Sequence, residues 1–202
     1  MNRRGFLLGM FAAATPWTRL AFADEDKLAA VSRARSGVKT LVGPFTQVAT
    51  IGLLRSQQQS SGTLYLQYPS RIRWELGPPD SVTYWVAPEG LAYKGAHGSG
   101  RVAPSSSQQA DVDALRSILA GDPAALRARF DVKEIASDTT GPAFECTAKA
   151  AGPLKKLTFW LDADLVRPRK ATIVYDNRNQ TQITFGELKR DQPIDPALLV
   201  LP

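Results

Sequence analysis

The stretch Gly62-Thr-Leu-Tyr-Leu-Gln-Tyr-Pro-Ser-Arg-Ile-Arg-Trp-Glu-Leu-Gly-Pro-Pro-Asp80 decides the fold class of this chain. From Arg71 to Leu76 apolar and charged residues alternate strictly, which places the apolar side chains on one face of a strand. Leu64 and Leu66 are also two positions apart, and the Pro69-Ser70 pair between the two segments is a turn signal. The stretch therefore predicts two antiparallel strands of a sheet with one apolar face.

Short alternating segments and helical patterns continue along the chain from this hairpin. Further strands are predicted over residues 82–86, 91–94, 100–103, 130–135, 143–148, 154–161, 169–175 and 180–189, and an extended apolar tail over 194–202. Helices are predicted over residues 24–47 (ending near Gly43-Pro44), 111–119 and 123–130. The fold class is mainly β (α+β): a single strongly curved antiparallel sheet, with helices on one side or over its open mouth.

Composition and charge exclude several classes of function. The formal net charge is +6, but the basic residues are scattered, whereas nucleic-acid binding needs clustered Lys and Arg. The chain has one histidine, His97, and one cysteine, Cys146, so an internal disulfide and a His/Cys zinc site are excluded. No Gly-x-Ser-x-Gly nucleophile motif is present and no pair of acidic residues stands out, so we expect no enzyme, although a glycosidase with two carboxylates stays open. We also expect no cofactor and no metal.

The N-terminus has the three parts of a secretory signal. A basic start with Arg3 and Arg4 precedes the apolar run 6–14, and Ala21-Phe22-Ala23 is an A-x-A cleavage site. The arginine pair also fits twin-arginine export, and both routes stay open. We predict a cleaved signal peptide over 1–23, a single domain over 24–202, a periplasmic location and no stable insertion in a membrane, because no later segment is long and apolar enough to span one.

Several segments, in order, resemble the periplasmic lipoprotein-carrier family, the LolA-like proteins. These segments are Phe45-Thr46-Gln47, Ser60 to Leu66, Pro69 with Arg71-x-Arg73-Trp74, Pro88-Glu89-Gly90 with Tyr93, Asp176-Asn177 with Gln180-Thr181, Ile183-x-Phe185, and Ile194-Asp195 with the final apolar residues. Each is weak alone, but together they extend over most of the chain that follows the signal.

The resemblance implies an unclosed β-barrel of about eleven strands with a helical lid. Members of the family take a lipoprotein from an inner-membrane exporter and deliver it to a lipid-anchored receptor at the outer membrane. This chain has no cysteine after the cleavage site that could be lipidated, so it is similar to the carrier rather than the receptor. We expect a monomeric carrier of lipoprotein or another lipid. The alternative is a periplasmic module that senses lipid or lipoprotein and signals through a protein partner.

One position departs from the family pattern. In the carriers an arginine that is thought to hold the lid precedes the proline after the second strand, and here that residue is Tyr68. A tyrosine hydroxyl can make a hydrogen bond, but it lacks the forked, charged donors of arginine. Arg71 or Arg73 could replace it, so the candidate lid contacts are Tyr68, Arg71 and Arg73, and another lipid as cargo stays open.

A carrier of acyl chains needs a large apolar concave face, because each CH₂ exposed to water costs about 0.8 kcal/mol. The alternating strands can supply it, with polar residues left on the outer face. The candidates for this face are Leu64, Leu66, Ile72, Trp74, Val82, Tyr84 and Phe185. The same alternation also fits plain core packing, and only the resemblance favours a lining.

Overall fold

The computed structural model describes residues 26–52, 56–102, 116, 119, 122–135, 140–175 and 179–202, and within them twelve strands form one antiparallel sheet. The strands are β1 Thr40–Ile51, β2 Ser56–Gln67, β3 Arg71–Leu76, β4 Val82–Ala87, β5 Gly90–Gly95, β6 Gly98–Val102, β7 Phe130–Ile135, β8 Ala143–Ala148, β9 Lys156–Leu161, β10 Pro168–Val174, β11 Gln180–Phe185 and β12 Lys189–Arg190. The α-helices are α1 Lys27–Arg35 and α3 Pro123–Arg129, and a 3-10 turn, η1, covers Pro196–Leu199.

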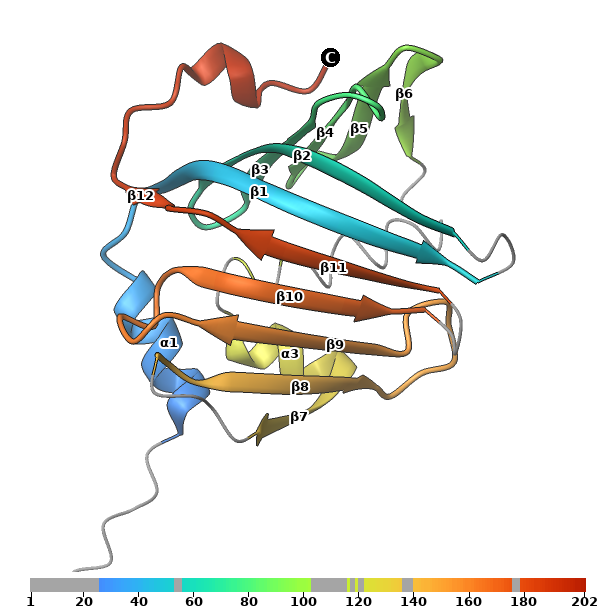
Figure 1. Cartoon of the computed structure of the whole chain (residues 1–202). Coiled ribbons are helices and arrows are strands. Elements are labelled where there is room, and N and C mark those ends of the chain that lie inside the picture. Colours follow the sequence, from blue (N-terminus) through green and yellow to red (C-terminus); the bar gives the residue numbers. More distant parts are fainter. Residues whose placement is uncertain are drawn as a thin grey trace, which may run out of the picture.

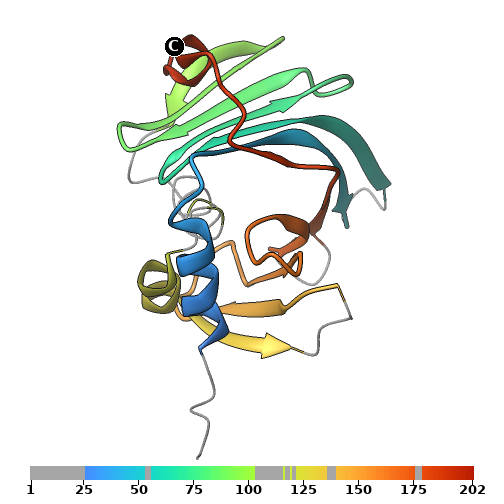
Figure 2. The same ribbon diagram turned by 90° about the vertical axis from the view of Figure 1, so that its left-hand side faces the viewer.

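The sheet consists of two meanders, β1 to β6 and β7 to β11, which are joined by the pairing of β1 with β11. Its order is β6-β5-β4-β3-β2-β1-β11-β10-β9-β8-β7, and β12 also pairs with β1 (Figure 1). The order ends at β6 and β7, so the described sheet is not closed. Seen along its side it is a deep open curve, with α1 and α3 on the concave side (Figure 2). We call these two helices the lid. The predicted fold class, an unclosed and strongly curved antiparallel sheet, is confirmed.

The first predicted helix is wrong beyond Arg35. Asp26 caps α1 by accepting hydrogen bonds from the backbone N–H groups of Leu28 and Ala29, but the helix has only 9 residues. Residues 40–51 instead form β1, paired with β2 on one side and with β11 on the other. Apolar residues at 38, 41, 42 and 45 fit a helical period as well as a strand, and long-range pairing decides between them.

Pro44 lies inside this central strand, where a proline normally removes a ladder hydrogen bond. Its position explains the tolerance: the pairing of β1 passes there from β11, at Phe45 opposite Phe185, to β12, at Val42 opposite Lys189. The Pro44 carbonyl still accepts a hydrogen bond from Gly186 N at 2.9 Å. The single strand predicted over 180–189 is accordingly split into β11 and β12 at this point.

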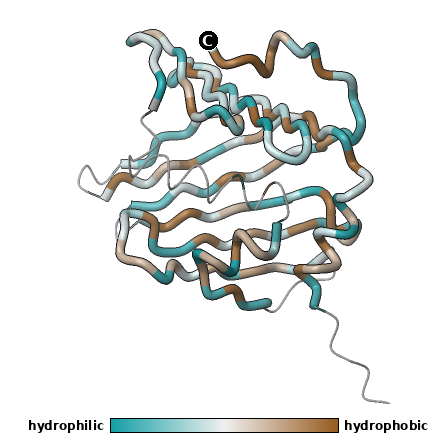
Figure 3. Tube along the Cα trace, turned by 180° about the vertical axis from the view of Figure 1, so that it is seen from behind, coloured by the Kyte–Doolittle hydropathy of each residue, from teal (hydrophilic) through white to brown (hydrophobic). Residues whose placement is uncertain are grey.

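Alternation gives the sheet an apolar concave face. The trace seen from behind, towards the lid side, alternates between hydrophobic and hydrophilic residues along the strands (Figure 3). Leu28 and Val31 of α1 and Leu126 of α3 belong to the same buried cluster as the inward side chains of the strands. The lid therefore completes the core, and does not form a separate layer.

The C-terminal segment lies against the convex face. The predicted extended tail is corrected to the short turn η1, which Asp195 caps by accepting from Ala197 N and which has Pro196 in its first turn. Trp85 Nε1 donates to the Leu198 carbonyl at 2.9 Å, so this aromatic ring of β4 is buried on the outer face. The predicted signal peptide over 1–23 and all but residues 116 and 119 of the predicted helix over 111–119 lie outside the described residues.

Gly62 of β2 is a position at which only glycine fits. It stands opposite Phe45 of β1 and Leu76 of β3 in the sheet. A Cβ at this position would collide with the backbone carbonyl oxygen of Glu75 and lie 2.7 Å from Phe45 Cζ. The Phe45 ring occupies the space that a side chain at position 62 would need, so these two residues are packed as a unit.

We predict that Gly62→Ala lowers the free energy of unfolding by about 2 kcal/mol, because the added carbon overpacks the centre of the sheet. Gly37→Ala is the matched control: nothing lies within 4 Å of its added carbon. Urea unfolding monitored by tryptophan fluorescence measures both variants. Equal stability of the two variants would contradict the packing described for Phe45.

Cys146 is a core residue of β8 and is fully buried. Burial, together with the neighbouring Glu145 carboxylate, raises the pKa of its thiol to about 12. The neutral thiol is an apolar packing group, in agreement with the sequence interpretation of this residue as a small buried hydrophobe.

We therefore expect Cys146 to resist thiol reagents at pH 8 in the native protein and to react completely in denaturant. The stability that the buried thiol contributes is fully present below pH 9, which is the ordinary pKa of a thiol, and is lost as the pH rises towards 12. Between these two pH values the thiol ionises only in the unfolded protein. A colorimetric thiol assay with and without guanidinium checks the reactivity. Rapid stoichiometric labelling of the folded protein would refute the buried position.

Candidate functional site

Five of the seven predicted lining residues meet on the concave face and are buried. They are Leu64, Leu66, Ile72, Trp74 and Phe185, and their exposed fractions are 0%, 0%, 2%, 8% and 7%. Leu64 pairs with Trp74 and Leu66 with Ile72 across β2 and β3, while Phe185 comes from β11, on the other side of β1. We call these five residues and Phe45 the apolar wall.

Three aromatic rings form the centre of the apolar wall. The ring centroids of Phe45 and Trp74 are 4.0 Å apart, and Phe185 meets Trp74 edge-on at 6.1 Å. The prediction missed Phe45 as a lining residue, because it placed this residue at the end of a helix. Its pairing with Phe185 was the one signal that could have found it, and that pairing joins distant parts of the chain.

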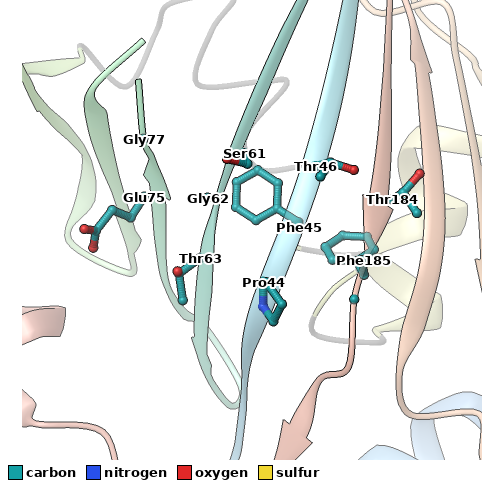
Figure 4. A pocket seen from close by; sticks show the side chains of 11 residues that line it. Pro44, Phe45, Thr46, Ser61, Gly62, Thr63, Glu75, Gly77, Thr184 and Phe185 are labelled. Atoms are coloured by element: carbon teal, nitrogen blue, oxygen red, sulfur yellow. The ribbon is translucent and has the colours of Figure 1, made fainter. Parts of the chain in front are cut away.

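A hollow of about 520 Å³ lies beside these rings, where β1, β2, β3 and β11 meet. Its lining residues are Pro44, Phe45, Thr46, Ser61, Gly62, Thr63, Glu75, Gly77, Thr184, Phe185 and Gly186. Figure 4 shows the Phe45 ring beside Gly62 and the Phe185 ring next to it. The volume is within the range of small-ligand pockets, about 300–1,000 Å³. Thr63, Glu75 and Thr184 alternate along their strands with residues of the apolar wall, so their side chains point to the convex face and the hollow is not a cavity within the wall.

The other two predicted lining residues lie on the same face at its open end. Val82 is partly buried and packs against the core cluster. Tyr84 stands directly opposite Trp74 in the register of β3 and β4, but 37% of it is exposed. The concave face is therefore closed over Trp74 and open at Tyr84.

The lid is held by a buried cation that the sequence analysis did not single out. Arg35, the last residue of α1, is only 2% exposed. Its Nε donates to the Val166 carbonyl and its Nη1 to the Leu119 carbonyl, each at 3.1 Å. Three segments far apart in the chain thus meet at one guanidinium. Burial lowers the pKa of Arg35, and nearby Tyr68 and Asp164 act in the opposite direction and raise it.

Tyr68, the candidate lid contact, faces this same cation. Its hydroxyl is buried and makes no hydrogen bond within the described part of the chain. Burial raises the pKa of Tyr68, and the charge of Arg35 acts in the opposite direction. Tyr68 thus lies near a cation of the lid, and no hydrogen bond joins its hydroxyl to that cation.

The other two candidate lid contacts lie on the opposite face of the sheet. Arg73 pairs with Glu75 at 2.8 Å, lies 5.0 Å from the Trp85 ring centroid and donates to the Leu198 carbonyl. Arg71 forms an ion pair with Glu89. Their neighbours are thus the convex face and the C-terminal segment, and the expectation that they replace the latch is corrected. Alternation along β3 puts both arginines on the face opposite Trp74.

The described residues show neither a metal site nor a membrane-spanning helix. Within these ranges, no three His, Cys, Asp or Glu side chains gather where they could hold a metal ion. No helix among them is long and apolar enough to cross a membrane. The site is therefore described by its apolar wall and by the contacts of its lid.

An open antiparallel sheet with an apolar concave face and two short helices on that side is a half-barrel fold. Residues 36–200 match the family described as outer membrane lipoprotein carrier protein LolA. The chain belongs to the LolA family, as the ordered segments around Trp74 and Phe185 predicted. None of the curated proteins matches this sequence.

Solved structures share the fold at low identity. A DUF1329 family protein from Desulfovibrio piger is 13% identical, with 86% of this chain and 95% of that chain covered, at a TM-score of 0.54. In the MucA/MucB complex of Pseudomonas aeruginosa, the matching chain is 15% identical, with 87% and 60% covered, at a TM-score of 0.52. These similarities concern the fold alone.

We predict that Arg35→Met lowers the free energy of unfolding by about 2–4 kcal/mol, because two buried carbonyl oxygens lose a charged donor. Arg33→Met, on the exposed side of the same helix, is the control and should change stability by less than about 0.5 kcal/mol. Chemical unfolding gives the two stabilities, and hydrogen exchange should show faster opening of α1 in the Arg35 variant. If both variants behave alike, Arg35 does not hold the lid.

Proposed function

We propose that this protein is exported to the periplasm and binds the acyl chains of a lipoprotein, or of another acylated lipid, against the apolar wall. As a carrier, the protein would receive the ligand from an inner-membrane exporter and pass it to an outer-membrane receptor. Binding requires no covalent chemistry. It rests on the transfer of apolar surface out of water, worth about 0.8 kcal/mol for each CH₂.

The observation that carries this proposal is the aromatic centre of the apolar wall, which lies on the same concave side of the sheet as the two short helices. Phe45, Trp74 and Phe185 come from both halves of the sheet and meet on its concave face. The helices α1 and α3 have 9 and 7 residues, too short to be stable without packing against the sheet. A lid of this kind can move away from the wall without unfolding the strands.

The described state is the closed one. Leu64, Leu66 and Trp74 are too deeply buried to touch a ligand without movement of the side chains that cover them. Release of the Arg35 contacts to the β9–β10 turn and to Leu119 would free the C-terminal end of α1. An acyl chain can then replace the lid side chains on the wall, so that little apolar area becomes exposed during the exchange.

A sensing role that acts through a protein partner is the second candidate. It is favoured by the fold shared with a structure of MucB and with a chain of the MucA/MucB complex. The two functions differ in what leaves the protein: a carrier hands on its lipid, whereas a sensor keeps its partner and transfers nothing.

The first test is uptake of a fluorescent acyl probe by the delipidated protein, with native mass spectrometry of the protein purified from periplasm. We expect one ligand for each chain. Trp74→Leu should weaken probe binding about tenfold, because it removes aromatic area worth about 1–2 kcal/mol from the wall. Trp160→Leu is the matched control, since Trp160 lies on the convex face, where Lys170 is 5.1 Å from its ring centroid.

The outcomes separate the candidate functions. Wild-type protein that binds no probe and carries no lipid would refute acyl binding. The sensing role would then come first if a protein partner is bound. Equal effects of the Trp74 and Trp160 substitutions, in variants shown by circular dichroism to be folded, would place the ligand away from the apolar wall.

A further inference from the structure

A second hollow lies on the convex face, between the strands β3 to β5 and the C-terminal segment. Its volume is about 760 Å³, which is within the range of small-ligand pockets. The last residues of the chain lie beside β4, β5 and β6 in both views (Figure 1 and Figure 2). We call this space the outer hollow. Strand residues line one side of it and residues of the C-terminal segment the other, among them Arg73, Thr83, Lys94, Val200, Leu201 and Pro202.

Three side chains of the sheet attach the C-terminal segment to the convex face. Trp85 Nε1 donates to the Leu198 carbonyl at 2.9 Å, and Arg73 Nη1 donates to the same oxygen at 3.4 Å. Arg101 donates to the Pro202 oxygen through Nε at 3.4 Å and Nη2 at 3.2 Å. The segment is therefore held at residues 198 and 202, and the outer hollow lies beside the part between them.

The strand side of the outer hollow is positively charged. Arg73 and Lys94 are the only charged side chains in its lining, which contains no carboxylate. The charge of Arg73 is largely balanced, because its Nε and Nη2 both donate to Glu75 Oε2, at 3.1 and 2.8 Å. Lys94 is exposed and has neither an ion pair nor a hydrogen bond within the described part of the chain. The outer hollow thus has one cation whose charge is not balanced.

The other side of the outer hollow is apolar and exposed. Val200 is 63% exposed, more than any other large hydrophobic residue in the part of the chain that the structure describes. Leu201 and Pro202 extend this apolar side, and Ser81 and Thr83 add hydroxyl groups that can donate to an anion. An exposed apolar surface beside an unbalanced cation suits a ligand with a negative charge next to an apolar group.

We propose that the outer hollow is a docking site for a short acidic segment of a partner protein. A carboxylate of the segment lies beside Lys94, and a neighbouring apolar side chain packs on Val200 and Leu201. An anionic membrane fits less well, because recruitment to one takes a cluster of about four to eight cations, whereas this lining has two and one of them is paired. The site goes beyond the proposed function: it lies on the face opposite the apolar wall, so the protein can hold a partner and an acyl ligand together.

The test measures binding of dye-labelled hexapeptides by fluorescence anisotropy at low ionic strength, where exposed charge pairs are strongest. The peptides alternate Asp with Leu, Val or Phe, and a second set has Asn in place of Asp. We expect the wild-type protein to bind an Asp peptide about three- to fivefold more tightly than its Asn counterpart. Lys94→Glu should weaken this binding about tenfold and improve binding of the same peptide with Lys in place of Asp. Lys133→Glu, at an exposed position of β7 on the other edge of the sheet, is the matched control.

Four results would overturn the docking site. The first is that no Asp peptide binds, or that the Asn peptides bind equally well. The second is that Lys94→Glu and Lys133→Glu have equal effects, which would show attraction by the net charge alone. The third is flotation with phosphatidylglycerol vesicles that Lys94→Glu abolishes, in the absence of peptide binding, which would assign the outer hollow to a membrane. The fourth is displacement of the Asp peptide by the fluorescent acyl probe, which would place the peptide on the apolar wall. Failure of the acyl probe itself to bind refutes only the proposed function.

Discussion

The structure depends on the pairing of β1 with β11. Every other full-length pair in the sheet joins strands that follow each other in sequence, from β1 to β6 and from β7 to β11. The two meanders become one sheet only because Phe45 to Thr50 pair with Gln180 to Phe185. The same contact brings Phe45 and Phe185 to Trp74, so the strand pairing that joins the halves also builds the aromatic centre of the apolar wall. Architecture and candidate site thus have one origin.

An unclosed sheet leaves apolar surface that must be covered. In this protein α1 and α3 cover it, and Arg35 anchors the end of α1 through carbonyl groups of two other segments. A buried cation is expensive to desolvate, so its value lies in geometry: it fixes one closed arrangement that is lost when its acceptors move apart. Tyr68 contributes a ring to the core and a hydroxyl beside this cation. A contact of this type suits a lid that must close firmly and still open.

Much of the fold could be predicted from local patterns, because a strand shows its period of two wherever one face is buried. The bounds predicted for β3, β7 and β8 are those observed. The errors lie where local patterns are ambiguous. Residues 40–51 fit a helix as well as a strand, and only their pairing on both sides decides. The arginines at 71 and 73 were assigned to the lid from their nearness in sequence to Tyr68, although alternation turns them to the other face.

The sequence by itself determined the class of the protein: an apolar-faced antiparallel sheet, helices beside it, few reactive side chains and an ordered set of segments similar to the LolA family. These features are local, because periodicity, turn residues and composition act over a few positions. Only the tertiary structure decided that Phe45 belongs to the apolar wall, that Arg35 rather than Arg73 lies near Tyr68, and that Tyr84, opposite Trp74, is exposed. These contacts join residues far apart in the chain, and burial at each depends on which elements lie above it.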